Sequence, residues 1–265
     1  MRTSASETDF IVVAPSDRLR RFISHYWLSR NNSESTYVAL PDGSVDIVIE
    51  ESSVAARSWV FGSTTSRTEI PLATNVHYLG VRFAPGQSRH FIRAAARELT
   101  DAHESTRGLL GFSLDGVSSA LTDDRVFSRI DRLIETYLGR VPPNDSCIDG
   151  IIRRIGAMHG SERIDEIASM AGWSRRHLER VFLETVGVSA KFFSMIARAN
   201  YARCLLRSPM NPGLAQVAID AGYADQSHMS RDFRRLTGLS PCAFAKPHVA
   251  FIQDAPEPRT QTGAP

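Results

Sequence analysis

Two stretches in the C-terminal half of the chain, residues 167–173 (IASMAGW) and residues 217–223 (VAIDAGY), repeat each other at an offset of 50 residues. After one inserted residue, Ala224, the match continues at an offset of 51. The further matched pairs are His177 and His228, Arg180 and Arg231, Phe182 and Phe233, Gly187 and Gly238, and Phe193 and Phe244. A match sustained over this length indicates that one supersecondary unit is used twice.

Each copy carries the signals of a helix-turn-helix unit. Gly172 and Gly222 stand where the chain must leave a first helix, and glycine adopts the positive φ of such a turn at the lowest cost. Ser174 and Asp225 follow as N-cap residues of a second helix, because their side-chain oxygens can accept free backbone N–H groups. Residues 190–206 contain no Gly or Pro, which predicts one helix connecting the two units.

Both second helices are expected to have a buried face and an outward face. Leu178 and Phe182 follow helical spacing in the first copy, as Met229 and Phe233 do in the second. Asp232 interrupts the apolar pattern of the second copy. Side chains on the outward face near a helix N-terminus can reach base edges in a major groove. The expected DNA contacts are Arg175, Arg176, Glu179 and Arg180 in the first copy, Gln226, Ser227, Ser230 and Arg231 in the second, and Arg234 and Arg235 at phosphates.

The charge of the chain is divided between its two halves. Residues 1–150 carry a net charge of −3, whereas residues 151–250 carry +6. A basic half joined to an acidic half predicts a polyanionic partner for the basic half alone. Helical hairpins with polar outer faces often bind nothing, but two copies in a basic region favour DNA.

The second copy, residues 218–241, reads AIDAGYADQSHMSRDFRRLTGLSP. With this motif and its first copy, residues 148–246 resemble the DNA-binding domain of the AraC/XylS family of bacterial transcription regulators. The resemblance implies a sequence-specific regulator that reads two adjacent major-groove segments of double-stranded promoter DNA. RNA polymerase, a small effector and a second copy of the chain are further candidate partners.

The N-terminal part is predicted to be mostly β, with helices after residue 86. Short alternating or apolar runs, such as residues 45–49 and 76–83, are separated by turn residues. The stretches LPDGSVDIV (residues 40–48) and GVRFAPG (residues 80–86) resemble, more weakly, the sensor-like domain of one AraC/XylS subgroup. The apolar stripe on residues 125–138 fits a helix packed on this domain, which we favour, or a dimer helix.

The expected fold is therefore α+β with two domains. A cupin- or jelly-roll-like β-barrel with flanking helices covers residues 10–140, and an all-α domain with two helix-turn-helix units and a linker helix covers residues 147–250. Residues 254–265 are polar and rich in proline, which predicts a disordered tail.

An effector pocket in the first domain is a further hypothesis. Aromatic and basic side chains on the predicted strands could surround a small ligand with an apolar body and an anionic group. The candidates are His25, Trp27, Trp59, Tyr78 and Arg82. The alternative for these residues is an ordinary barrel core and rim.

The rival to a DNA-binding regulator is a small β-barrel enzyme with a helical regulatory appendage. No paired acid and base and no histidine spacing typical of a metalloenzyme supports it, so we expect no catalytic residue, metal or cofactor. The three cysteines are far apart without a C-x-x-C motif, and no apolar run approaches the roughly 20 residues of a membrane span. We therefore expect a cytoplasmic protein that does not associate with membranes.

Overall fold

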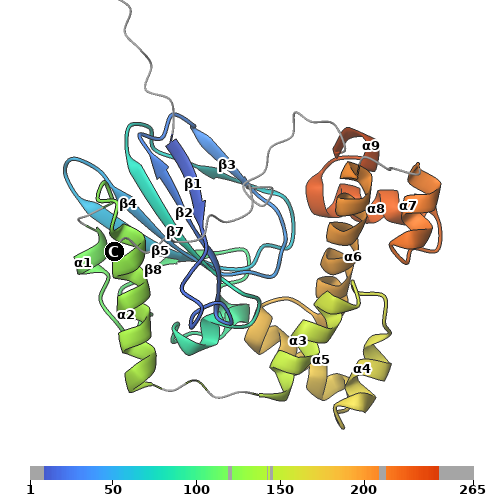
Figure 1. The fold of residues 1–265 in the computed structure, drawn as a ribbon. Helices are drawn as coiled ribbons and strands as arrows, with labels where there is room; N and C mark the ends of the chain where they lie inside the picture. The colour runs from blue at the N-terminus through green and yellow to red at the C-terminus, as the bar shows by residue number, and fades with distance from the viewer. Residues whose placement is uncertain (1–8, 119–120, 142, 144–145, 209–212, 245–265) are drawn as a thin grey trace, which may run out of the picture.

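The computed structural model describes residues 9–118, 121–141, 143, 146–208 and 213–244 (Figure 1). We refer to residues 9–141 as the N-terminal domain and to residues 146–244 as the C-terminal domain. The β-rich N-terminal domain and the helical C-terminal domain lie side by side (Figure 1). The expected tail at 254–265 and the end of the expected DNA-binding domain at 245–250 lie outside the described residues.

The N-terminal domain contains two antiparallel sheets. The larger has the strand order β1-β2-β7-β4-β5-β8, and the smaller pairs β3 with β6. The strands are β1 (Asp9–Val13), β2 (Ile23–Arg30), β3 (Thr36–Ala39), β4 (Asp46–Glu51), β5 (Ala56–Phe61), β6 (Thr68–Pro71), β7 (His77–Phe83) and β8 (His103–Ser105). This arrangement confirms the mostly β N-terminal fold expected from the sequence.

Side chains alternate between the two faces of the large sheet, as the strand period of two requires. One face carries Ile47, Leu79 and Val81, which pack in a core with Ile130 and Ile134 of helix α2 (Val126–Arg140). The stripe on α2 therefore packs against its own domain. Helix α1 (Asp115–Ser118) contacts α2, and the domain also contains the 3-10 helices η1 (Ser88–His90) and η2 (Ala96–Glu98).

The C-terminal domain is entirely helical over its described residues. Its helices are α3 (Cys147–Ala157), α4 (Ile164–Met170), α5 (Arg175–Val186), α6 (Ala190–Arg207), α7 (Leu214–Asp220), α8 (Gln226–Thr237) and α9 (Pro241–Phe244). The predicted connecting helix is α6, which extends one residue beyond the expected end. The pairs α4–α5 and α7–α8 are the two helix-turn-helix units, so the expected fold of this domain is confirmed. None of the described helices combines the length and apolar character that spanning a bilayer requires.

Candidate DNA-binding surface and the cavity between the domains

The two helix-turn-helix units begin and end their second helices in the same way. The side chain of Ser174 accepts a hydrogen bond from the backbone N–H of His177, and that of Asp225 accepts one from the N–H of His228. Both α5 and α8 are 12 residues long. Each ends at a left-handed glycine, Gly187 with φ +91° and Gly238 with φ +74°. The N-caps predicted from the sequence are confirmed.

A single hydrophobic core holds both units on helix α6. Leu178 and Phe182 of α5 and Met229 and Phe233 of α8 are each no more than 1% exposed and belong to one cluster. Phe193 of α6 packs against Phe182, with the ring centroids 5.5 Å apart. Because the buried faces share this core, the opposite faces of α5 and α8 are left to solvent.

Most of the predicted DNA contacts lie on these outer faces. The exposed ones are Arg175, Arg176, Arg180, Gln226, Ser227, Arg231, Arg234 and Arg235, and the half-buried ones are Glu179 and Ser230. Exposure is what a groove-reading surface requires, but contact with DNA at each position stays a prediction.

Three of the predicted contacts on α5 have partners within the protein. Arg175 lies 3.2 Å from a carboxylate oxygen of Asp165, and Arg180 lies 3.1 Å from one of Glu184, one helical turn later. Glu179 accepts a hydrogen bond of 3.3 Å from the backbone N–H of Ala190, at the start of α6. Arg175 and Arg180 must therefore leave their carboxylate partners before they can bind DNA. The Glu179 carboxylate instead links α5 to the start of α6.

The five effector candidates share one face of the large sheet, opposite the face that α2 covers. The strand register pairs His25 with Arg82 and Trp27 with Gly80, and it places Tyr78 and Trp59 on the same side. Trp27 and Tyr78 are buried in a small cluster on this face. Their packing in this cluster is consistent with the alternative interpretation, a barrel core, and a role of either residue in binding an effector stays a prediction.

Arg82 is the centre of a buried ion network. Its guanidinium lies 2.8 Å from Asp46 and 2.9 Å from Asp42. Burial acts to lower the pKa of Arg82, but the two carboxylates outweigh it and hold that pKa well above its ordinary value. Two carboxylates of its own domain therefore already bind this arginine, and contact between Arg82 and an anionic group of a ligand stays a prediction.

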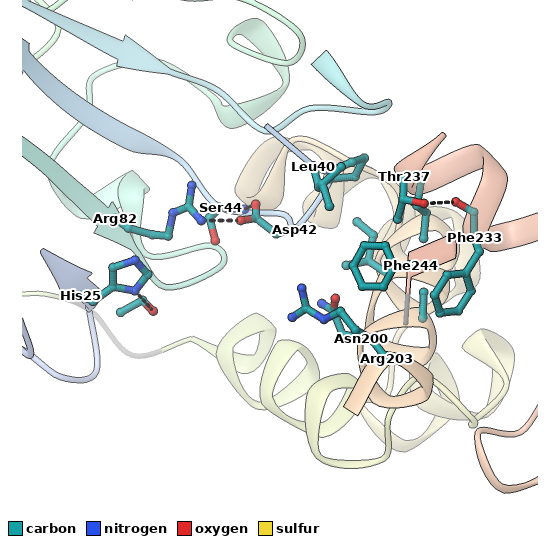
Figure 2. Close-up of a pocket in the computed structure, with 15 residues that line it drawn as sticks. His25, Leu40, Asp42, Ser44, Arg82, Asn200, Arg203, Phe233, Thr237 and Phe244 are labelled. Carbon is teal, nitrogen blue, oxygen red and sulfur yellow. Dashed lines mark hydrogen bonds and ion pairs between the residues drawn. The ribbon is translucent and has the colours of Figure 1, made fainter. Parts of the chain in front are cut away.

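A cavity of about 190 Å³ lies between the two domains (Figure 2). His25, Asp42 and Arg82 line it from the N-terminal domain, and Figure 2 shows Asn200, Arg203 and Phe244 on the opposite side. Its remaining lining residues are Ser24, Leu40, Pro41, Ser44, Ile196, Ala199, Phe233, Leu236 and Thr237. Of the five effector candidates, only His25 and Arg82 line this cavity.

His25 is the least satisfied polar residue of the cavity wall. Its Nε2 atom is buried and has no hydrogen-bond partner among the described residues. Burial, and then the neighbouring charge of Arg82, lower the pKa of His25 to about 4. The imidazole is therefore neutral at physiological pH, and its Nε2 can accept or donate a hydrogen bond.

The two motif stretches of the N-terminal domain form part of its contact with the C-terminal domain. Gly43 and Gly86 both have positive φ, and a Cβ on either would lie within 2.7 Å of a side chain of the other domain, Phe193 and Ile152 respectively. Just after the second motif, Arg89 lies 2.8 Å from Asp149 of α3. The stretches that resemble a sensor domain therefore also position the C-terminal domain, which carries the candidate DNA-binding surface.

Sequence reasoning missed the polar residues of this contact. Ser63, Arg97 and Thr100 of the N-terminal domain bond to the end of α5. No local pattern marks them, because each lies in a loop or a short 3-10 helix and its partner is at least 87 residues away in the sequence. Among the described residues, no group of three His, Cys, Asp or Glu side chains could hold a metal ion.

Comparisons with known proteins separate the same two regions. Residues 11–105 match a family model described as a domain of unknown function (DUF6597), and residues 167–246 match a model described as a helix-turn-helix domain. The Msm operon regulatory protein of Streptococcus mutans is 24% identical over 139 residues, half of each chain. HTH-type transcriptional regulator Rv1931c of Mycobacterium tuberculosis is 33% identical over 91 residues, 34% of this chain and 35% of that protein.

Among solved structures, a transcriptional regulator from Chromobacterium violaceum, described as having an AraC-type DNA-binding domain, is 26% identical with a TM-score of 0.33. The match covers 36% of this chain and 85% of the Chromobacterium violaceum chain. The chain spans about half or less of the length of the curated relatives that it matches. The match of residues 167–246 to the helix-turn-helix domain model confirms the resemblance of this part of the chain to the AraC/XylS regulators.

Proposed function

We propose that this protein is a sequence-specific DNA-binding transcription regulator of the AraC/XylS type. The observation that carries the proposal is the pair of capped second helices, α5 and α8, on one core with their polar faces exposed. The net charge of +6 on residues 151–250 supports a polyanionic partner for this surface.

In the proposed mechanism each second helix enters a major groove of double-stranded promoter DNA. Helix α6, with 18 residues, is about 27 Å long and joins the two units rigidly. The two helices then address one face of the DNA about one helical turn, roughly 34 Å, apart. Such a site covers about 16–20 base pairs, within which Arg234 and Arg235 would bind phosphates.

We infer that the N-terminal domain, residues 10–140, senses a signal and that residues 147–250 bind DNA. We place a small effector in the interdomain cavity, where Nε2 of His25 has no hydrogen-bond partner among the described residues. RNA polymerase and a second copy of the chain are further partners in this scheme. The chain then acts in the cytoplasm, by binding and without catalysis.

Fluorescence anisotropy of the full chain on DNA selected from a random pool tests the proposal. We expect specific binding, with log K falling by about 0.9 per contacted phosphate for each decade of salt. Arg176→Ala should weaken it, because Arg176 is exposed and pairs with no acidic side chain among the described residues. Arg57→Ala, an exposed arginine on β5 of the other domain, is the matched control.

A chain that selects no DNA sequence would contradict the regulator and leave the enzyme alternative. A thermal-shift screen of small aromatic and aliphatic metabolites tests for the effector, and at least one compound should raise the melting temperature of the wild type. The same compound should lose most of its effect on His25→Ala. A screen without any shift up to millimolar concentrations would remove the effector from the proposal.

A further inference from the structure

The last turn of α5 is held by hydroxyl groups of the N-terminal domain. Ser63 Oγ donates a hydrogen bond of 2.8 Å to the carbonyl of Val186, and Thr100 Oγ1 donates one of 2.7 Å to the carbonyl of Gly187. Ser63 is 1% exposed, so the first of these bonds is shielded from water. The final carbonyls of a helix have no partner within the helix, and here another domain supplies the partners.

Backbone packing and charge reinforce the same contact. A Cβ on Gly187 would lie 3.0 Å from the carbonyl oxygen of Ala96, in η2. Arg97, also in η2, lies 3.0 Å from Glu184, the residue that pairs with Arg180 on α5. Burial acts to raise the pKa of Glu184, but the hydrogen bond from Arg97 and the nearby Arg180 lower it below its ordinary value. The carboxylate thus joins a predicted base-reading arginine to the N-terminal domain.

At the equivalent turn of α8, the hydrogen bonds among the described residues stay within its own domain. At the position matching Val186 stands Thr237, whose hydroxyl accepts from the N–H of Leu239 at 3.1 Å and donates to the carbonyl of Phe233 at 2.8 Å. A Cβ on Gly238 would meet only the flexible side chain of Arg67, at 3.2 Å. Within the described part of the chain, the hydrogen bonds and ion pairs of α8 all stay inside the C-terminal domain.

Helix α3, which precedes the first unit, is fixed to the N-terminal domain as well. Asp149, in its first turn, accepts hydrogen bonds from Gln87 at 2.7 Å and from Arg89 at 2.8 Å while it completes the capping box with Ser146. Burial acts to raise the pKa of Asp149, but these hydrogen bonds outweigh it and lower that pKa. The N-terminal domain therefore holds the end of α5 and the start of α3 through charged or hydroxyl groups.

We propose that Ser63, Thr100 and Arg97 form a clamp through which the N-terminal domain positions α5, and not α8, for DNA. The inference rests on the proposed DNA-binding function and adds which unit the N-terminal domain acts on. Without the clamp, the end of α5 is free to fray or tilt, and DNA must then order it at the cost of binding free energy. These three are positioning residues, because none of them is expected to touch DNA.

The test compares Ser63→Ala/Thr100→Val in the full chain with Thr237→Val, the matched change in the second unit. Selections with Arg180→Ala and Arg231→Ala first assign each half of the site to α5 or α8. The loss of one hydrogen bond corresponds to about a 2- to 12-fold change in an equilibrium constant. We expect Ser63→Ala/Thr100→Val, the clamp variant, to bind the intact DNA site about 5- to 100-fold more weakly than the wild type does. On DNA whose α5 half is scrambled, the two proteins should bind almost equally.

Thr237→Val should show the opposite pattern, with its loss abolished only when the α8 half is scrambled. Thr100→Ser, which keeps the hydroxyl, should bind as the wild type does. Equal losses on both halves, or no loss by a folded clamp variant, would overturn the clamp.

Amide hydrogen exchange without DNA separates this inference from the proposed function. In the clamp variant we expect faster exchange in the last turn of α5 and unchanged exchange in α8. If the wild type binds no DNA, the proposed function fails, and exchange still decides whether the N-terminal domain holds α5. Unchanged exchange in α5 would then reject the clamp.

Discussion

The two helix-turn-helix units have the same internal design but different surroundings. Arginines of α5 pair with Asp165 and Glu184, and the end of that helix is bonded to the N-terminal domain. On α8, Arg231 and Arg234 are exposed and pair with no acidic side chain among the described residues. Duplication thus supplies two similar helix-turn-helix units, and among the described residues the hydrogen bonds from the N-terminal domain reach the end of α5 and not that of α8.

The largest expected effect is a loss of folding stability that should be similar in the two units. Phe182→Ala and Phe233→Ala remove equivalent side chains that are 0% and 1% exposed in one core. Each should lower the free energy of unfolding by about 3–5 kcal/mol, as truncation of a buried phenylalanine does. Urea unfolding followed by circular dichroism measures both. A loss under 1 kcal/mol for one of them would show that the two units do not share the core equally.

The two C-cap glycines should separate the units. Ala at Gly187 or Gly238 must adopt a left-handed conformation, which costs about 1–2 kcal/mol in either place. At Gly187 the new methyl also meets backbone of η2 and the hydroxyl of Thr100, and forced contacts of this kind typically add about 1–3 kcal/mol. Gly187→Ala should therefore be the more destabilising variant in thermal unfolding. Equal melting temperatures would contradict the close approach of the N-terminal domain to α5.

The sequence predicted each unit well because the signals of a helix-turn-helix are local. Ser174 caps a helix that begins at the next residue, and Gly172 has the positive φ of the turn before it, so both can be recognised without knowing the fold. The helical period likewise identified Phe182 and Phe233 as buried. The repeat strengthened each assignment, since the same signals recur in the second copy.

The surroundings of the units were beyond sequence reasoning for a physical reason. Hydrogen bonds such as that from Ser63 to Val186 join residues that are 123 positions apart, and a serine in a loop has no pattern that names its partner. Arg82 was recognised as a candidate, but its charge balance depends on Asp42 and Asp46, which only the folded sheet brings to it. Local chemistry is readable from sequence, whereas contacts between domains depend on the assembled fold.

Substitutions in the reading surfaces test whether the first unit contributes more sequence preference than the second. Arg180 and Arg176 can each present a fork to guanine, and a lost bidentate base contact costs about 1–3 kcal/mol, or roughly 5- to 150-fold in affinity. Arg180→Ala should therefore relax the preference in the α5 half of the site more than Arg231→Ala does in the α8 half. Arg234→Ala should instead weaken all sequences alike.

Selections from randomised DNA with the wild type and each variant measure these preferences. An unchanged sequence preference for Arg180→Ala would mean that its ion pair with Glu184 persists on DNA. A larger loss of preference for Arg231→Ala would reverse the order of the two units.

The smallest expected effect concerns a position where α8 has a charged residue and α5 has an apolar one. Asp232 stands where α5 has Val181, and it is half-buried with His228 Nε2 at 3.8 Å. Burial raises the pKa of Asp232, although the charges of His228, Arg198, Arg235 and Arg231 oppose the shift. The ionised carboxylate is therefore less favourable in the folded chain than in the unfolded chain.

The sign of the pH dependence follows from this shift. Between the unfolded pKa of about 3.9 and the higher folded value, the folded chain binds more protons than the unfolded chain, so the contribution of Asp232 to stability falls as pH rises through that window. Asp232→Asn cannot ionise and should equal or exceed the wild type by less than about 1 kcal/mol at pH 7. The difference should shrink as pH falls toward 4, because the Asp232 carboxyl becomes increasingly protonated in the folded and the unfolded wild-type chain. Val181→Asp is the matched variant, because it places a carboxylate at the equivalent position of α5, and it should be destabilising at pH 7 and less so at pH 4. Urea unfolding of the wild type, Asp232→Asn and Val181→Asp at pH 7 and pH 4 measures the effect. If Asp232→Asn lowers the free energy of unfolding by more than 1 kcal/mol at pH 7, the charge of Asp232 stabilises α8 through its basic neighbours.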